Sequence, residues 1–183
     1  MNLDISSNRS AQKYTTGEQL RRLLWIFGQL LFRFSPRPCF GWRRMVLRCF
    51  GASVGNHVNT YPSTRIYFPW NLTVGDWSAI GEDALIYNLG PVTLGQKVTV
   101  SHRAHLCAGT HDFLRPDMAL LKPPIAIGEG AWICADAFVG PGVTIGALCV
   151  VGARSVVVRD LPPGTVCAGN PCRVLKPRPA PTA

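Results

Sequence analysis

The sequence lacks an apolar run long enough to cross a bilayer, and it has few acidic residues. Its longest uncharged apolar run in the N-terminal region, residues 23–32, is 10 residues long, whereas a membrane-spanning helix takes about 20. No Gly-X-Y period orders the 18 glycines and 15 prolines, which excludes collagen. The mainly polar first 19 residues show no signal-peptide pattern. We therefore expect a cytoplasmic protein.

Cysteine pairs in the CxxC spacing are also missing. The chain has 7 cysteines, an odd number, and several stand where a small residue is needed. We interpret them as reduced thiols in or near the core of a protein from a reducing compartment.

Positive charge is concentrated at one end of the chain. Residues 1–50 contain nine Arg and Lys against Asp4 and Glu18, a balance of +7, and the remaining residues contribute only +2 of the net +9. Such a segment would suit a membrane surface or another anion, or would form the solvated face of an arginine-rich helix. Nucleic-acid binding is disfavoured, because no recognition motif accompanies the charge.

A helical lead is predicted before residue 51. Residues 1–14 are expected to lack regular structure, Thr15 and Glu18 form a possible capping box, and Pro36 ends the helix that follows. An apolar stripe recurs at helical spacing in that helix. It consists of Leu20, Leu23, Leu24, Phe27, Leu30, Leu31 and Phe34. Two interpretations stay open and are compatible with each other: the stripe covers the open end of a repeat domain, or it binds a membrane surface.

A six-residue repeat occupies the middle of the chain. Its longest unbroken run has aliphatic residues at six-residue intervals. These are Ile127, Ile133, Val139, Ile145, Val151 and Val157. A period of six fits neither a helix nor an isolated strand. It fits an all-β solenoid with three flat sides, about eighteen residues in each coil and parallel pairing, so that Ile127 stacks on Ile145 and Ile133 on Val151.

The repeat is interrupted once, between Leu106 and Ile127. The intervening residues include Pro116, Pro123 and Pro124 with several charges, which a regular coil cannot absorb. We expect a loop extruded at about residues 108–124. Loops on a rigid scaffold often carry function.

Three motifs resemble the hexapeptide-repeat acyltransferases, in the branch of sugar O-acetyltransferases. They are Ile127–Ile133 (IGEGAWI), Pro141–Gly146 (PGVTIG) and Gly169–Val174 (GNPCRV). Residues 31–36, 47–52 and 86–92 resemble the colanic-acid-type exopolysaccharide acetyltransferases more loosely. The resemblance implies a left-handed parallel β-helix over residues 51–160, after a lead at 1–50 and before a short C-terminal tail at 161–183. It also implies a homotrimer.

The activity implied by this resemblance is transfer of an acetyl group from acetyl-CoA to a sugar hydroxyl in the synthesis of an exopolysaccharide or other surface glycan. A sugar hydroxyl needs a base to take its proton, and histidine suits that task near neutral pH. His111 in the extruded loop matches the family's catalytic histidine. Asp112 beside it is a less favoured partner, and Asn88 loosely matches an asparagine that contacts the acceptor.

The same resemblance places acetyl-CoA in a groove between neighbouring subunits. Six positions match the family's cofactor contacts: Ala135, Ala153, Val158, Arg159, Arg173 and Lys176. The small residues would admit the pantetheine arm, and the basic ones would pair with phosphates. Val158 replaces a frequent threonine of the family, so a side-chain hydrogen bond is lost there.

Four other functions remain open at this stage. They are N-acetylation of an amino sugar, acetylation of serine, a scaffold without catalysis, and a metal enzyme of the γ-type carbonic anhydrase kind, built on a similar β-helix. The metal enzyme needs three convergent histidines. The spacing of His102, His105 and His111 does not match that site, so no metal is expected. For the basic lead, we expect peripheral contact with the cytoplasmic face of a membrane, where a lipid-linked glycan would be the acceptor.

Overall fold

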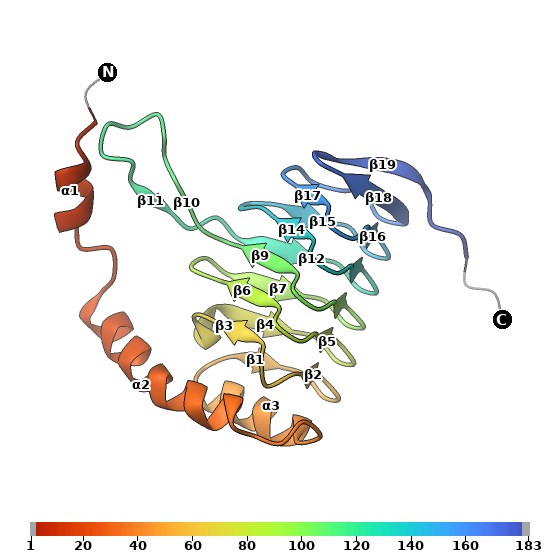
Figure 1. The fold of residues 1–183 in the computed structure, drawn as a ribbon, viewed down its shortest axis with the longest axis horizontal. Coiled ribbons are helices and arrows are strands. Elements are labelled where there is room, and N and C mark those ends of the chain that lie inside the picture. Colours follow the sequence, from red (N-terminus) through yellow and green to blue (C-terminus); the bar gives the residue numbers. More distant parts are fainter. Residues whose placement is uncertain (1–2, 181–183) are drawn as a thin grey trace.

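The computed structural model describes residues 3–180 as a parallel β-helix preceded by helices. Figure 1 shows the coils stacked in chain order, with the helices along one end and one side of the stack. A hairpin loop projects from the stack toward the N-terminal helix. The β-helix supplies the rigid frame, and the loop and the helices are attached to it.

Three helices form the lead: α1 (Ile5–Ser10), α2 (Thr16–Arg33) and α3 (Phe40–Cys49). The predicted capping box at the start of α2 is confirmed, because the Thr15 hydroxyl accepts from Glu18 N while the Glu18 carboxylate accepts from Thr15 N. The expectation that residues 1–14 lack regular structure is wrong, because Asp4 caps α1 by accepting from Ser7 N.

The β-helix has three sheets, here called A, B and C in the order in which each coil visits them. Sheet A contains β1 (Ser53–Val54), β4 (Leu72–Val74), β7 (Val92–Leu94), β12 (Ile125–Ile127) and β15 (Thr144–Ile145). Sheet B contains β2 (Asn59–Thr60), β5 (Ala79–Ile80), β8 (Thr99–Val100), β13 (Trp132–Ile133), β16 (Val150–Val151), β18 (Thr165–Gly169) and β19 (Cys172–Pro177). Sheet C contains β3 (Arg65–Ile66), β6 (Leu85–Tyr87), β9 (His105–Cys107), β14 (Phe138–Val139) and β17 (Val156–Val157).

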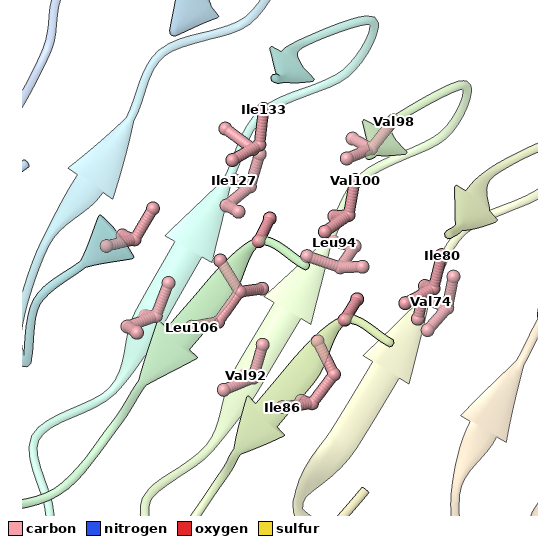
Figure 2. Close-up of a cluster of buried hydrophobic side chains, with 14 of the residues drawn as sticks. Val74, Ile80, Ile86, Val92, Leu94, Val98, Val100, Leu106, Ile127 and Ile133 are labelled. Atoms are coloured by element: carbon pink, nitrogen blue, oxygen red, sulfur yellow. The ribbon is translucent and has the colours of Figure 1, made fainter. Parts of the chain in front are cut away.

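Most strands of the β-helix point at least one aliphatic side chain into the core. Ile127 pairs with Ile145, and Ile133 pairs with Val151, both in parallel register, so the predicted stacking is confirmed. Figure 2 shows inward side chains of successive coils in a row, such as Ile80, Val100 and Ile133. Successive coils bury side chains at equivalent positions, and the apolar core therefore runs the whole length of the stack.

The early coils are longer than the eighteen residues expected. Val54 pairs with Val74, and Val74 pairs with Leu94, so each of these coils takes 20 residues. The additional residues lie in the corner between sheets C and A, where the short helix η1 (Pro69–Asn71) follows Phe68. Periodicity of the later repeats alone gave no sign of this wider corner.

The C-terminal tail continues the β-helix beyond residue 160. Strand β18 pairs with β16 in parallel, and β19 then folds back on β18 in antiparallel pairing. Arg178 donates to the carbonyls of Gly130 and Leu148, both at 3.0 Å. Residues 165–177 of the predicted C-terminal tail thus add two strands to sheet B.

The lead covers the first coil, but with a different face of α2 from the one predicted. Trp25 and Phe32 are buried, and Trp25 Nε1 donates to the carbonyl of Ile66 at 2.9 Å. The stripe predicted to cover the end of the solenoid points outward instead; Phe34, for example, is 84% exposed. The interpretation of the stripe as the cap is wrong, because α2 has a second, narrower apolar face that packs inward.

Not all of the positive charge of the lead is at the surface. The Arg43 side chain in α3 is fully buried and donates to the carbonyls of Thr60, Pro36 and Arg37. Burial lowers the pKa of its guanidinium group. Arg43 therefore joins the lead to the first coil and contributes nothing to an anion-binding surface.

Candidate active site

The extruded loop leaves the β-helix at the corner between sheets C and A. It carries the short antiparallel strands β10 (Thr110–His111) and β11 (Leu120–Leu121). Its returning limb crosses directly over Gly90, where a Cβ atom would collide with the backbone of Lys122 and Pro123. The base of the loop is thus fixed against the coil, as an active-site loop requires.

His111 is exposed on this loop, and its ring is oriented by a backbone carbonyl. Nδ1 lies 2.7 Å from the carbonyl oxygen of Met118. A carbonyl only accepts hydrogen bonds, so Nδ1 must carry the proton. In the neutral ring the Nε2 atom then keeps its lone pair, which is the state that a general base needs.

The same carbonyl connects the histidine to the N-terminal helix. Asn8 in α1 donates from Nδ2 to the carbonyls of Asp117 and Met118, both at 2.6 Å. Asp4 N donates to Pro116 O at 2.8 Å. Figure 1 shows α1 beside the tip of the hairpin. The N-terminal segment, which is far from the loop in sequence, therefore holds the residues that orient His111.

Asp112 does not orient the histidine. Its carboxylate accepts a hydrogen bond from Leu114 N at 3.1 Å, and its own N–H donates to Ala119 O. The alternative of a His111–Asp112 dyad therefore loses its support: the ring is held by Met118, and Asp112 shapes the turn.

Asn88 lies in the same corner, one coil earlier, but it is fully buried. Its side-chain oxygen accepts from Phe68 N at 3.0 Å and from Tyr67 N, and Nδ2 donates to Phe68 O. The side chain thus holds two wide corners together. The side chain has no exposed atom in this structure, and the contact with the acceptor expected at Asn88 stays a prediction.

Four of the predicted cofactor positions flank sheet C, and the other two lie on β19 of sheet B. Ala135 and Ala153 lie in the corner between sheets B and C, and Arg154 N donates to Ala135 O. Val158 and Arg159 follow β17, in the corner that also carries the loop, and both are exposed. Arg173 and Lys176 are exposed on β19. One subunit thus presents these positions at three places: the corner between sheets B and C, the corner after β17, and strand β19.

The remaining histidines of this region do not gather around one point. His105 projects from sheet C with its ring against Phe138, whereas His102 is exposed at the corner between sheets B and C. Burial lowers the pKa of His105. Within residues 3–180, no three His, Cys, Asp or Glu side chains form a group that could hold a metal ion.

Sequence reasoning missed Asn8 and the carbonyl of Met118. Asn8 lies 109 and 110 residues from its two partners, and a backbone carbonyl has no residue-type signature. The only available signal was the loop itself, whose position the break in the repeat revealed.

Known proteins resemble this chain in sequence and in fold. Residues 124–159 match the family model described as bacterial transferase hexapeptide (six repeats). The chain is 40% identical over 176 residues to the Escherichia coli (strain K12) protein named "Putative colanic acid biosynthesis acetyltransferase WcaF", covering 96% of this chain and 97% of the relative.

Two solved structures share nearly the whole fold. A maltose O-acetyltransferase from Clostridium difficile 630 has a TM-score of 0.81 and 27% identity, with 97% of this chain and 98% of that chain covered. A galactoside acetyltransferase in complex with coenzyme A has a TM-score of 0.83 and 27% identity, with 96% and 92% covered. The predicted left-handed parallel β-helix is confirmed. The chain is an enzyme that belongs to the hexapeptide-repeat family of acetyltransferases.

Proposed function

We propose that this enzyme transfers the acetyl group of acetyl-CoA to a sugar hydroxyl in the synthesis of a surface glycan. The observation that carries the proposal is the orientation of His111, whose Nδ1 is held by Met118 O. Nε2 accepts the proton of the sugar hydroxyl as its oxygen attacks the thioester carbonyl. The relative named for colanic acid biosynthesis supports an acceptor from exopolysaccharide synthesis.

The proton then leaves Nε2 with the product thiol. As the tetrahedral intermediate collapses, the carbon–sulfur bond breaks and coenzyme A departs as a thiolate that takes this proton, while the acetyl group remains on the sugar oxygen. The ring returns to its neutral state, and Nδ1 keeps its own proton throughout, hydrogen-bonded to the Met118 carbonyl. The histidine thus returns to its starting state without help from a carboxylate.

Acetyl-CoA is proposed to bind between two subunits of a homotrimer. The candidate positions at the two corners that flank sheet C support this arrangement, because opposite corners of two neighbouring subunits would each supply part of a lining. Ala135 and Ala153 leave room for the pantetheine arm, and Arg159, Arg173 and Lys176 supply positive charge for phosphates. Light scattering should give a mass three times that of one chain. Arg173→Ala should raise KM for acetyl-CoA about tenfold with a smaller change in kcat.

The central test replaces His111 with alanine and measures release of the CoA thiol with a panel of sugar acceptors. Loss of the base should lower kcat/KM by about 10²–10⁴-fold. His57→Ala is the matched control, because His57 is also exposed but stacks on Trp77 at a distant corner. Unchanged turnover in His111→Ala would reject the proposed base.

The product distinguishes the remaining functions. Mild alkali removes an acetyl ester but leaves an amide intact, so an alkali-stable product would show N-acetylation of an amino sugar. Acetylated serine would be recognised by its mass. No turnover by the parent enzyme on any acceptor, with acetyl-CoA bound, would favour a scaffold without catalysis.

A further inference from the structure

The outward side of α2 presents a continuous apolar surface, here called the outer face. Its side chains are all at least half exposed, from 50% for Leu24 to 84% for Phe34. The outer face consists of Leu20, Leu23, Leu24, Ile26, Phe27, Leu30, Leu31 and Phe34. Helical spacing brings them to one side, opposite the buried Trp25 and Phe32. Contiguous apolar patches on this scale mark binding surfaces.

The apolar surface continues from α2 onto α3. A hollow at the junction is lined by Leu30, Leu31, Phe34, Ser35, Pro36, Cys39 and Trp42. Trp42 is 42% exposed, and its Nε1 donates to Leu31 O at 2.9 Å. An indole ring with an apolar body and one satisfied polar group is typical of residues at a membrane–water interface.

Arginines accompany the outer face. Residues 15–50 contain one acidic residue, Glu18, and seven arginines, of which Arg43 is buried and adds nothing to this surface. On the helix, Arg22 and Arg33 lie along one boundary of the outer face, and Arg21 lies toward the other. All three side chains are exposed. Positive charge beside an apolar face complements a surface that is apolar inside and anionic outside.

We propose that the outer face of α2 lies in the interface of an anionic membrane, with the helix axis in the membrane plane. Among the described residues, no helix is both long and apolar enough to cross a membrane, so the helix rests in the headgroup region. A second copy of this chain fits less well, because a two-fold contact through the outer face would bring the same arginines together.

This placement has a consequence for the active site, and that consequence alone rests on the proposed function. The segment before α2 runs to the loop: Tyr14 lies between Arg22 and Lys122, whose charges are 4.4 and 4.5 Å from its ring centroid. A membrane-bound α2 would hold the loop that bears His111 near the lipid surface. The acceptor class that fits this placement is a glycan attached to a lipid carrier.

The test is flotation of the full-length protein with vesicles, in the absence of acetyl-CoA and acceptor. Vesicles of equal parts phosphatidylcholine and phosphatidylglycerol should carry the protein upward at low salt, and phosphatidylcholine alone should carry much less. The double variant Phe27→Gln, Leu30→Gln should lower the bound fraction at least about tenfold, because two inserted apolar side chains are lost. Arg21→Gln, Arg33→Gln should weaken binding only to the anionic vesicles.

A matched control exchanges the same kind of residue elsewhere. Trp77 and Leu148 are 62% and 53% exposed, close to the 63% and 50% of Phe27 and Leu30. The variant Trp77→Gln, Leu148→Gln should float like the parent. Equal loss in both double variants, or no flotation of the parent, would overturn the proposal. A parent that stays below the vesicles and whose assembly dissociates in Phe27→Gln, Leu30→Gln would assign the outer face to a second copy. Because no reaction is measured, failure here leaves the test of His111 unaffected.

Discussion

In β13, Trp132 points outward and Ile133 points into the core, whereas in α2 two apolar faces compete for the inside. Ile133 is fully buried and pairs with Val100 on one side and Val151 on the other. Its direction is fixed by the alternation of a strand and repeated in every coil. In α2, the wide outer face stays exposed, and the face that bears Trp25 is buried.

The difference lies in what each pattern constrains. In a repeat, each side chain packs against the equivalent side chains of the coils above and below it. A side chain that pointed the wrong way would therefore disrupt the packing of several coils. A single helix has no equivalent neighbours that fix which of its faces packs inward. The apolar stripe was predicted to turn inward because the open end of a repeat domain needs a cover. The surface of α3 and the first coil instead accommodates Trp25, which contacts Phe50 at a centroid distance of 5.0 Å.

Truncating one residue on each face of α2 tests which face packs against the β-helix. Trp25→Ala should lower the free energy of unfolding by about 3–5 kcal/mol, because it opens a cavity and leaves Ile66 O without its donor. Phe27→Ala should change it by less than about 1 kcal/mol. Urea unfolding measures both. A larger loss for Phe27 would show that the outer face is the buried one.

The same contrast should hold between neighbours in the β-helix. Ile133→Ala should cost about 2–5 kcal/mol in unfolding free energy. Trp132→Ala should cost about 1 kcal/mol, because the residue is 46% exposed and its truncation opens no cavity in the core, while the hydrogen bond from Nε1 to Ser101 Oγ is lost. Equal costs, measured by urea unfolding, would contradict the assignment of inward and outward positions.

The sequence predicts what is local or periodic, and it fails where distant segments meet. The ladder from Ile127 to Val157 and the position of the loop follow from spacing alone. The wide corner that Asn88 closes does not, because it depends on the backbone of Phe68, one coil away. The orientation of His111 does not follow from spacing either. It depends on the Met118 carbonyl and on Asn8, which is separated from Met118 by more than half of the chain.

The contact between the lead and the loop gives a smaller effect. Asn8→Ala removes two donors from the segment that holds the Met118 carbonyl. We expect kcat/KM to fall about threefold to tenfold, in line with one or two hydrogen bonds of about 1 kcal/mol each, while the unfolding midpoint stays nearly unchanged. Asn8→Asp cannot donate and should behave like alanine. If Asn8→Ala acted like His111→Ala, α1 would belong to the catalytic machinery itself.

The smallest effect concerns His105, which faces outward from sheet C and yet has a buried Nε2 without a partner in the described structure. Burial lowers its pKa. As pH falls below the ordinary histidine pKa of about 6.5, the unfolded chain therefore binds a proton more readily than the folded chain does. Stability should therefore be intact above that value and decline below it. In urea unfolding at about pH 7.5 and about pH 5.5, His105→Gln should reduce the difference between the two midpoints, and His102→Gln, at an exposed corner, should not. An unchanged difference in His105→Gln would mean that this side chain is protonated as easily as one in water, and that outward positions of sheet C are as open as the pleat alone implies.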